Sequence, residues 1–124
     1  MEEFEDLLGK TLSNIENKND DQLIFTLESG EKYRLYHGQD CCESVDIEEI
    51  IGDLNDLIGS PITLAEEITH DDVDPNGVKN PGHAGSFTWT FYKLATIKGY
   101  ATIRWFGQSN GYYSENVSWE KIPD

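Results

Sequence analysis

The sequence predicts a single α+β domain built mostly of antiparallel β-sheet, as a meander, sandwich or half-barrel, with one or two short helices. Three observations predict this class: short segments in which apolar and polar residues alternate, turn-forming Ser-Gly and Asn-Gly pairs between them, and only two segments with helical spacing. The chain has 124 residues, and one hydrophobic core usually organises roughly 100 to 200 residues. We therefore expect residues 1–124 to form one domain.

The first third of the chain predicts one helix and three strands. Apolar residues near the start recur at helical spacing and are followed by Gly9, a residue type that commonly ends helices. Further along, apolar residues alternate with polar ones, and clusters of Asn, Asp, Ser and Gly separate the runs. The expected elements are a helix at residues 2–9, a strand from Leu12 that ends at the turn 17–21, and a hairpin of residues 22–28 and 32–37 joined by Ser29-Gly30.

Residues 43–58 fit two kinds of element. The first of them alternate as in a strand, whereas the apolar residues from Ile50 onward have the i, i+3, i+4 spacing of a helix. We expect a short strand followed by a helix near residues 53–58. Asp53 is its expected N-cap and Gly59 its expected end.

The second half of the chain predicts strands around one long loop. The loop is rich in Pro, Gly and Asn, and the strands after it are rich in aromatic and β-branched residues. The expected order is a strand at residues 62–68, the longest loop at residues 71–85, and a three-stranded antiparallel meander over residues 87–119 with turns at Lys98-Gly99 and Asn110-Gly111.

Charge is distributed unevenly along the chain. Twenty-four acidic and 9 basic residues give a net charge of −15. Residues 1–74 hold 21 acids and 4 bases, whereas residues 75–124 hold 3 acids and 5 bases, so the two halves carry −17 and +2. Because a polyanion or an anionic membrane repels such a chain, we expect neither as a direct partner. The sequence has no leader-like segment and no apolar run long enough to span a membrane, which favours the cytoplasm.

Two polar and aromatic segments are candidates for ligand binding. If Trp105 points into the core, the period of two turns Arg104 and Phe106 to the opposite face, together with Tyr92 and Tyr100. Rings stack on a planar ligand and arginine pairs with phosphate or carboxylate, so this face suits a planar anion. The alternative is that the face is covered and forms a second core layer. The candidate ligand-binding residues are Tyr36, His37, Asp40, Glu43, Arg104, Phe106, Asn110, Tyr112 and Tyr113.

Metal binding and catalysis have weaker signals. Cys41 and Cys42 are adjacent, whereas zinc knuckles separate their cysteines by two to four residues. A disulfide between neighbours needs a strained ring, so we expect thiols that pack as small apolar side chains. Residues 72–77 match the first half of a calcium loop, but its twelfth position is His83 instead of glutamate. No third residue orients a pair of His37 and a cysteine, so we expect no enzyme, no cofactor and no metal.

Several segments carry a family resemblance. They read YHGQDCCESV at residues 36–45, WTFYKLAT at residues 89–96 and GQSNGYYSE at residues 107–115. These segments resemble a family of small uncharacterised proteins found widely in tailed bacteriophages and their prophages, and the resemblance covers residues 9–119. It implies a phage or prophage origin but transfers no known binding or catalytic residues. We expect the polar segments 37–44 and 107–115 to lie near a site.

The resemblance implies a binding function, since small accessory phage proteins frequently act on the host. The favoured hypothesis is counter-defence in the host bacterial cytoplasm by sequestration of a nucleotide-derived immune signal, in a pocket that a homo-oligomer could close. The alternative is an acidic mimic of nucleic acid that inhibits a host defence protein. That alternative needs a wide negative surface and gives salt-sensitive binding, and residues 40–74 supply the charge.

Overall fold

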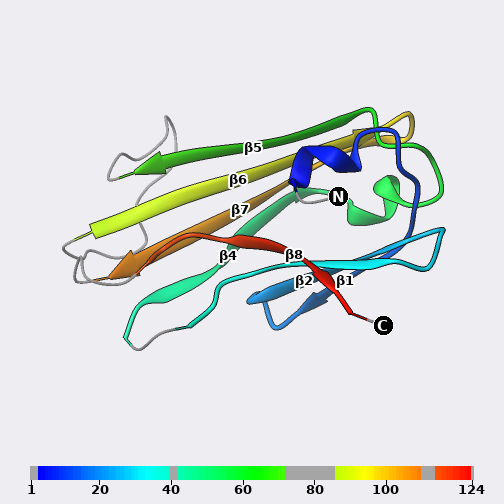
Figure 1. Cartoon of the computed structure of the whole chain (residues 1–124). Coiled ribbons are helices and arrows are strands. Elements are labelled where there is room, and N and C mark those ends of the chain that lie inside the picture. Colours follow the sequence, from blue (N-terminus) through cyan, green and yellow to red (C-terminus); the bar gives the residue numbers. More distant parts are fainter. Residues whose placement is uncertain (1–2, 40–41, 72–85, 110–113, 124) are drawn as a thin grey trace.

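The domain is a β-sandwich of two open antiparallel sheets (Figure 1). The computed structural model describes residues 3–39, 42–71, 86–109 and 114–123. The first sheet has the order β1-β2-β3-β8 and consists of β1 (Leu12–Lys18), β2 (Gln22–Leu27), β3 (Lys32–Tyr36) and β8 (Ser118–Ile122). The second sheet has the order β4-β7-β6-β5 and consists of β4 (Ser44–Gly52), β5 (Leu64–Asp71), β6 (Ser86–Thr96) and β7 (Gly99–Ser109). The predicted dominance of antiparallel sheet is therefore confirmed.

The turns of the first sheet lie where the sequence predicts them. Asn19 and Asp20 adopt positive φ angles of 55° and 59°, and the Asn17 side chain donates a hydrogen bond to Asp20 Oδ1 over 2.8 Å. Asparagine and aspartate tolerate this left-handed conformation better than most residues. The predicted hairpin of β2 and β3 is confirmed, with Gly30 in its turn at a φ of 95°.

One hydrophobic core fills the space between the sheets. Alternate residues of β2 and β3 face alternate residues of β6 and β7, as the period of two requires. Trp119 of β8 packs against this core, with ring centroids 5.4 Å from Phe4, 5.4 Å from Phe25 and 5.1 Å from Tyr33. The largest fully buried members are Trp105, Tyr33, Tyr92, Phe25, Leu7, Leu12, Leu23, Leu35, Leu57, Ile62 and Leu94.

The two expected helices are single 3₁₀ turns, so the α+β prediction is wrong for the described residues. They are η1 (Phe4–Leu7) and η2 (Leu54–Leu57). Isolated helical segments this short are marginal, and β4 runs on to Gly52 because its pairing with β7 competes with helix formation. The prediction of Asp53 as an N-cap is confirmed, since its side chain accepts a hydrogen bond from Asn55 N over 2.9 Å. No helix of the described ranges is long and apolar enough to cross a membrane.

The expected three-stranded meander is also wrong. β6 and β7 form the predicted hairpin, but β8 crosses to the first sheet and pairs with β3. The crossing lets Trp119 pack among three core rings, which stabilises the first sheet. The described strands form two separate open sheets and no closed barrel, which agrees with the sandwich among the predicted alternatives.

Tyr92 lies in the core, not on the outward face predicted for it. Tyr92 pairs with Ile103, and both residues are fully buried between the sheets. Its hydroxyl donates a hydrogen bond to Glu67 Oε2 over 2.5 Å. Burial, followed by this hydrogen bond, raises the pKa of Tyr92 well above its ordinary value. Tyr100, by contrast, is exposed on the outer face, as predicted.

The buried phenol predicts a loss of stability in alkali. Tyr92 ionises near pH 10 only in the unfolded chain, so its contribution is complete below pH ~10 and declines as the pH rises further. Unfolding free energies measured in urea from pH 8 to 11 should fall with pH, and Tyr92→Phe should make that fall shallower. Tyr100→Phe is the matched control and should leave the slope unchanged. Equal slopes in all three proteins would contradict the prediction.

Candidate functional site

A buried ion pair joins His37 and Glu43 at one end of the sandwich. His37 Nε2 lies 2.7 Å from Glu43 Oε2, and the two side chains are 4% and 0% exposed. His37 Nδ1 lies 2.7 Å from the carbonyl oxygen of Asn116. Because a carbonyl oxygen only accepts, Nδ1 is the donor in that contact. The pair therefore connects the chain after β3, the start of β4 and the segment before β8.

A second buried carboxylate holds the neighbouring strand ends. Glu115 accepts hydrogen bonds from Thr88 Oγ1 over 2.8 Å and from Ser109 Oγ over 2.5 Å. Gly107 lies against the same segment, since a Cβ atom there would be 2.8 Å from the Glu115 carbonyl oxygen. The two polar segments expected near a site, 37–44 and 107–115, lie side by side, because Ser44 pairs with Gln108 and His37 contacts Asn116, the residue after Glu115.

A hollow of about 350 Å³ opens beside the His37–Glu43 pair. The backbone N–H of Ile47 donates to the Asp20 carbonyl oxygen over 2.6 Å, which holds the turn between β1 and β2 against β4. Within the part of the chain that the structure describes, neither Asp21 nor Asp46 forms an ion pair, so the hollow has two uncompensated carboxylates. Its lining residues are Asp21, Gln22, Tyr36, His37, Gln39, Val45 and Asp46.

The hollow lies within a larger acidic surface, which we call the acidic edge. β1 and β4 are edge strands of the two sheets, and the bond from Ile47 to Asp20 brings them together. Exposed carboxylates follow both strands and the turn next to them. The acidic edge consists of Glu16, Asp20, Asp21, Asp46, Glu48, Glu49 and Asp53.

Arg104 is already bonded to two of these carboxylates. Its guanidinium lies 2.6 Å from both Glu48 Oε1 and Glu49 Oε2, and its side chain is 13% exposed. Neighbouring residues of a regular strand point to opposite faces, but a β-bulge between Ile47 and Glu49 lets both glutamates reach the same cation. The positive charge expected for an anionic ligand is therefore compensated within the chain.

Phe106 lies beside Arg104 on the outer face, in a packed aromatic cluster. Its ring centroid is 4.6 Å from that of Trp89 and 6.0 Å from that of Phe87. Trp89 is fully buried and Phe106 nearly so, while the Arg104 guanidinium lies 5.6 Å from the Trp89 ring. This part of the face corresponds to the packed second layer that the sequence left open as an alternative.

Tyr36 belongs to the outer face of the first sheet. Its hydroxyl donates to Glu120, and the Arg34 guanidinium lies 3.9 Å above its ring. The hydrogen bond, followed by burial, raises the pKa of Tyr36 above its ordinary value. Tyr36 and His37 share the hollow but lie apart from Arg104 and Phe106. Four other expected site residues, Asp40, Asn110, Tyr112 and Tyr113, lie outside the described residues.

The cysteine prediction is wrong at Cys42, which is disulfide-bonded. A disulfide sulfur is neither a thiolate ligand nor a nucleophile. Within the ranges that the structure describes, no group of three His, Cys, Asp or Glu side chains is placed to hold a metal ion. The calcium-like segment 72–77 and His83 fall outside those ranges.

Sequence reasoning missed several residues that build this end of the sandwich. Glu115 lies within the segment 107–115 that the family resemblance singled out, so the sequence indicated its place near the site but not its role. Ser109 lies in the same segment, whereas Thr88 and Asn116 gave no signal. The partners of these three residues are 6 to 79 residues away in the chain. The contribution of Asp21 depends on the contact between β4 and the turn before β2, which no local pattern reveals.

A comparison with models of protein families finds a match over nearly the whole chain. The model of a domain of unknown function, DUF7448, matches residues 5–119. The chain belongs to the DUF7448 family. No curated protein and no solved structure matches this DUF7448 chain. The family description contains nothing on phage origin or ligands, so both stay predictions.

Proposed function

We propose that this DUF7448 chain is a non-catalytic binding protein whose acidic edge binds a basic surface of another protein. The observation that carries the proposal is the hollow lined by Asp21 and Asp46, neither of which has a basic partner among the described residues, on an edge that bears five further exposed carboxylates. Unpaired carboxylates on a preformed surface attract a cationic partner over long range and favour rapid association. The proposed function is therefore binding alone, without catalysis of a reaction.

The buried polar contacts support a rigid binding surface. The pair of His37 and Glu43 fixes the wall of the hollow, and the bond from Ile47 to Asp20 fixes its rim. A surface whose side chains are held before binding loses less conformational entropy when a partner binds. The hollow is therefore suited to receive a basic side chain of the partner without rearrangement.

The partner class follows from charge together with the resemblance to phage proteins. Proteins that bind nucleic acid carry basic surfaces for phosphates. A phage protein with an acidic edge would compete for such a surface, which makes a nucleic-acid-binding host defence protein the partner that we propose. The function would then be counter-defence in the host cytoplasm.

Sequestration of a nucleotide-derived signal has less support. That hypothesis relies on Arg104 to pair with phosphate, but Glu48 and Glu49 already bind its guanidinium. A phosphate would have to displace two carboxylates and bring its own charge beside them, which is unfavourable. The acidic edge therefore carries the proposed function.

The test uses capture from host extract with charge-reversed variants. The immobilised protein should retain nucleic-acid-binding proteins at about 50 mM salt and release them at about 500 mM salt or on addition of duplex DNA. The double variant Asp21→Lys and Asp46→Lys should weaken the affinity for the retained protein about ten-fold or more, because it reverses the charge of the hollow. Affinity is measured by calorimetry with the identified partner.

The matched control places the same charge change elsewhere. The double variant Glu5→Lys and Glu28→Lys changes two exposed acids outside the acidic edge and should keep nearly the wild-type affinity. Equal weakening in both double variants would show that only net charge matters, and unchanged binding in the Asp21 and Asp46 variant would exclude the acidic edge.

A further inference from the structure

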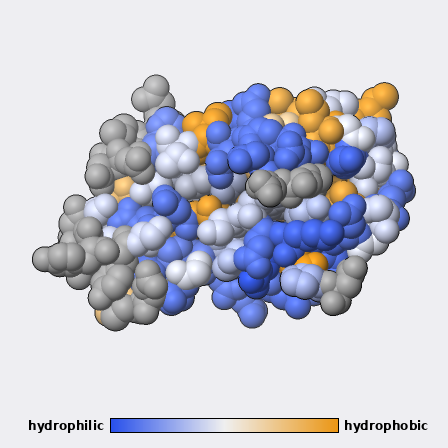
Figure 2. Space-filling view, viewed as in Figure 1, coloured by the Kyte–Doolittle hydropathy of each residue, from blue (hydrophilic) through white to orange (hydrophobic). Residues whose placement is uncertain are grey.

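A polar cleft opens between the two sheets on the side where β5 and β8 are the edge strands. η1 covers part of this side, since it packs against β5 and Phe4 contacts Trp119 of β8 (Figure 1). Hydrophilic side chains cover most of the molecule in the same view (Figure 2). The cleft measures about 280 Å³ and lies between the second sheet and the segment that leads into β8. We call it the inner cleft, and its lining residues are Glu67, Thr69, Thr90, Asn116 and Val117.

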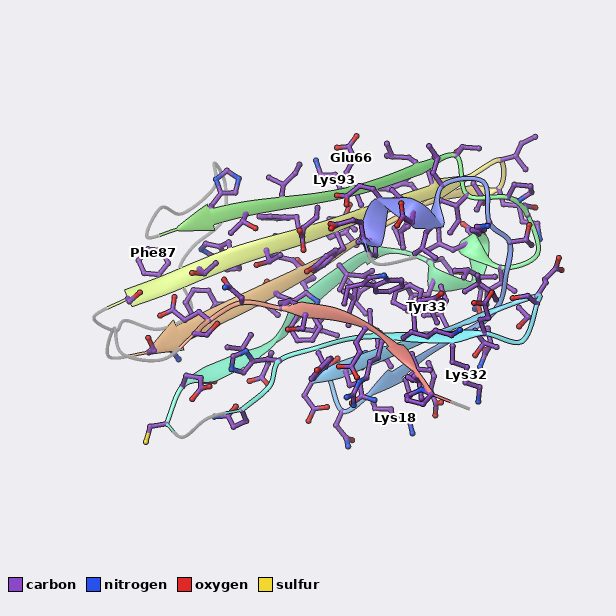
Figure 3. The ribbon with its side chains drawn as sticks, in the orientation of Figure 1. Lys18, Lys32, Tyr33, Glu66, Phe87 and Lys93 are labelled. Carbon is purple, nitrogen blue, oxygen red and sulfur yellow. The ribbon has the colours of Figure 1, made fainter. Side chains whose placement is uncertain are left out.

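Glu67 is held in position on the inner side of the second sheet. Figure 3 shows Glu66 and Lys93 on the side of this sheet away from the first sheet. Successive residues of a strand alternate between faces, so Glu67 lies on the inner side. The buried hydroxyl of Tyr92 donates a hydrogen bond to Glu67 Oε2, whereas Oε1 has no hydrogen-bond partner among the described residues. Oε1 is therefore available to a ligand.

Thr90 and its neighbour Trp105 have unmade hydrogen bonds. Thr90 is only 4% exposed and lines the inner cleft, yet its hydroxyl has no partner in the part of the chain that the structure describes. Trp105 pairs with Thr90 across β6 and β7, and its buried Nε1 also lacks a partner within the described ranges. Buried polar groups nearly always form hydrogen bonds, so both groups need a partner from outside the chain.

Asn116 forms the opposite wall of the inner cleft. Its carbonyl oxygen accepts from His37 Nδ1 over 2.7 Å, and its backbone N–H donates to Ser114 Oγ over 3.2 Å. These bonds fix the backbone, while the side-chain amide has no partner among the residues described. A polar wall that is fixed before binding loses little conformational entropy when a ligand binds.

We infer that the inner cleft binds a neutral polyhydroxylated molecule of about the size of one sugar ring. The Glu67 carboxylate only accepts hydrogen bonds and Trp105 Nε1 only donates, whereas the threonine hydroxyls and the Asn116 amide do both. A ligand hydroxyl also donates and accepts, so a polyol can serve all of these groups, but an ammonium group only donates. Glu67 and the net charge of −15 repel anions.

The size and lining of the inner cleft set the expected affinity. At roughly 30 Å³ per water molecule, it holds about nine waters, a volume that suits a single monosaccharide. Val117 is the apolar residue of its described lining, and that lining contains no aromatic ring on which a sugar could stack. We therefore expect dissociation constants of about 1–10 mM. The inner cleft and the acidic edge share no residue, so this inference does not rest on the proposed function.

NMR titration of the ¹⁵N-labelled protein tests the inference. The probes are glucose, galactose and N-acetylglucosamine, each added to about 100 mM. The indole N–H signal of Trp105, assigned by its absence from Trp105→Phe, and the backbone N–H signal of Thr90 should shift saturably with at least one of these sugars. Methylammonium chloride and sodium acetate at the same concentrations are the cationic and anionic probes, and neither should produce a saturable shift.

A matched pair of variants separates binding in the inner cleft from binding elsewhere. Thr90→Val should weaken sugar binding about ten-fold or more. It should leave the midpoint of urea denaturation unchanged or raise it, because the hydroxyl that it removes is buried without a partner. Thr102→Val makes the same change on the outer side of the sheet, opposite Lys93, and should keep the wild-type affinity. No saturable shift with any sugar, equal weakening by both variants, or saturable binding of methylammonium or acetate would overturn the inference.

Discussion

His37→Ala is expected to lower the free energy of unfolding by about 3–5 kcal/mol, the range for breaking a buried ion pair by removing one partner. The Glu43 side chain is 0% exposed, so removal of the imidazole takes away a partner that lies 2.7 Å from its carboxylate in a site closed to solvent. The Asn116 carbonyl oxygen would lose its hydrogen bond as well. Urea denaturation at pH 7 and 25 °C measures the loss.

Two further variants separate this effect from a general loss of packing. Lys121→Ala removes an exposed ion pair with Glu31 and should cost no more than about 1 kcal/mol. The double variant His37→Ala and Glu43→Ala should be more stable than His37→Ala alone, because it also removes the buried carboxylate that has lost its imidazole partner. A double variant that is as unstable as the sum of both single changes would show that the two side chains do not act as a pair.

The hairpins of this fold could be predicted because their signals are local. Residues 22–36 alternate in hydrophobicity on both sides of Ser29-Gly30, and both strands pair in that register. The position of β8 could not be predicted in the same way. The alternation of apolar and polar residues around Trp119 would suit a strand in either sheet. Which sheet β8 joins depends on the contacts of Trp119 with Phe4, Phe25 and Tyr33, which lie in distant parts of the chain.

In the candidate site, too, local features could be predicted from the sequence and contacts between distant residues could not. His37 and Glu43 are six residues apart, and the sequence placed both among the binding candidates. Their actual role is structural support of the hollow, because each uses its polar atoms on partners inside the protein. The pairing of Arg104 with both Glu48 and Glu49 depends on a β-bulge in β4. A bulge of one residue leaves no clear trace in the alternation of apolar and polar residues.

Tyr92 shows how an error in register moves a side chain from one face to the other. The sequence assigned it to the outward face by counting parity from Trp105 across a turn. In the structure Tyr92 pairs with Ile103, so it lies on the same face as Ile103 and Trp105. Parity within a strand is reliable, whereas parity between strands needs the turn length and the pairing register.

Gly52→Ala is expected to destabilise the protein by about 2–5 kcal/mol. A Cβ atom at Gly52 would lie 2.3 Å from the Tyr100 carbonyl oxygen and 3.1 Å from the Ala101 Cα atom. Both are backbone atoms of β7, so no side chain can move aside to make room. The φ angle of 96° adds a penalty of about 1–2 kcal/mol for any residue with a Cβ, and overpacking adds roughly 1–3 kcal/mol or more.

Gly30→Ala isolates the steric part of this effect. Gly30 has nearly the same φ angle, 95°, but nothing lies within 4 Å of a Cβ atom placed there. The difference between the two variants in urea denaturation therefore measures the clash between β4 and β7. Equal stability of the two variants would mean that β7 yields freely at this point, which its pairing with both β4 and β6 argues against.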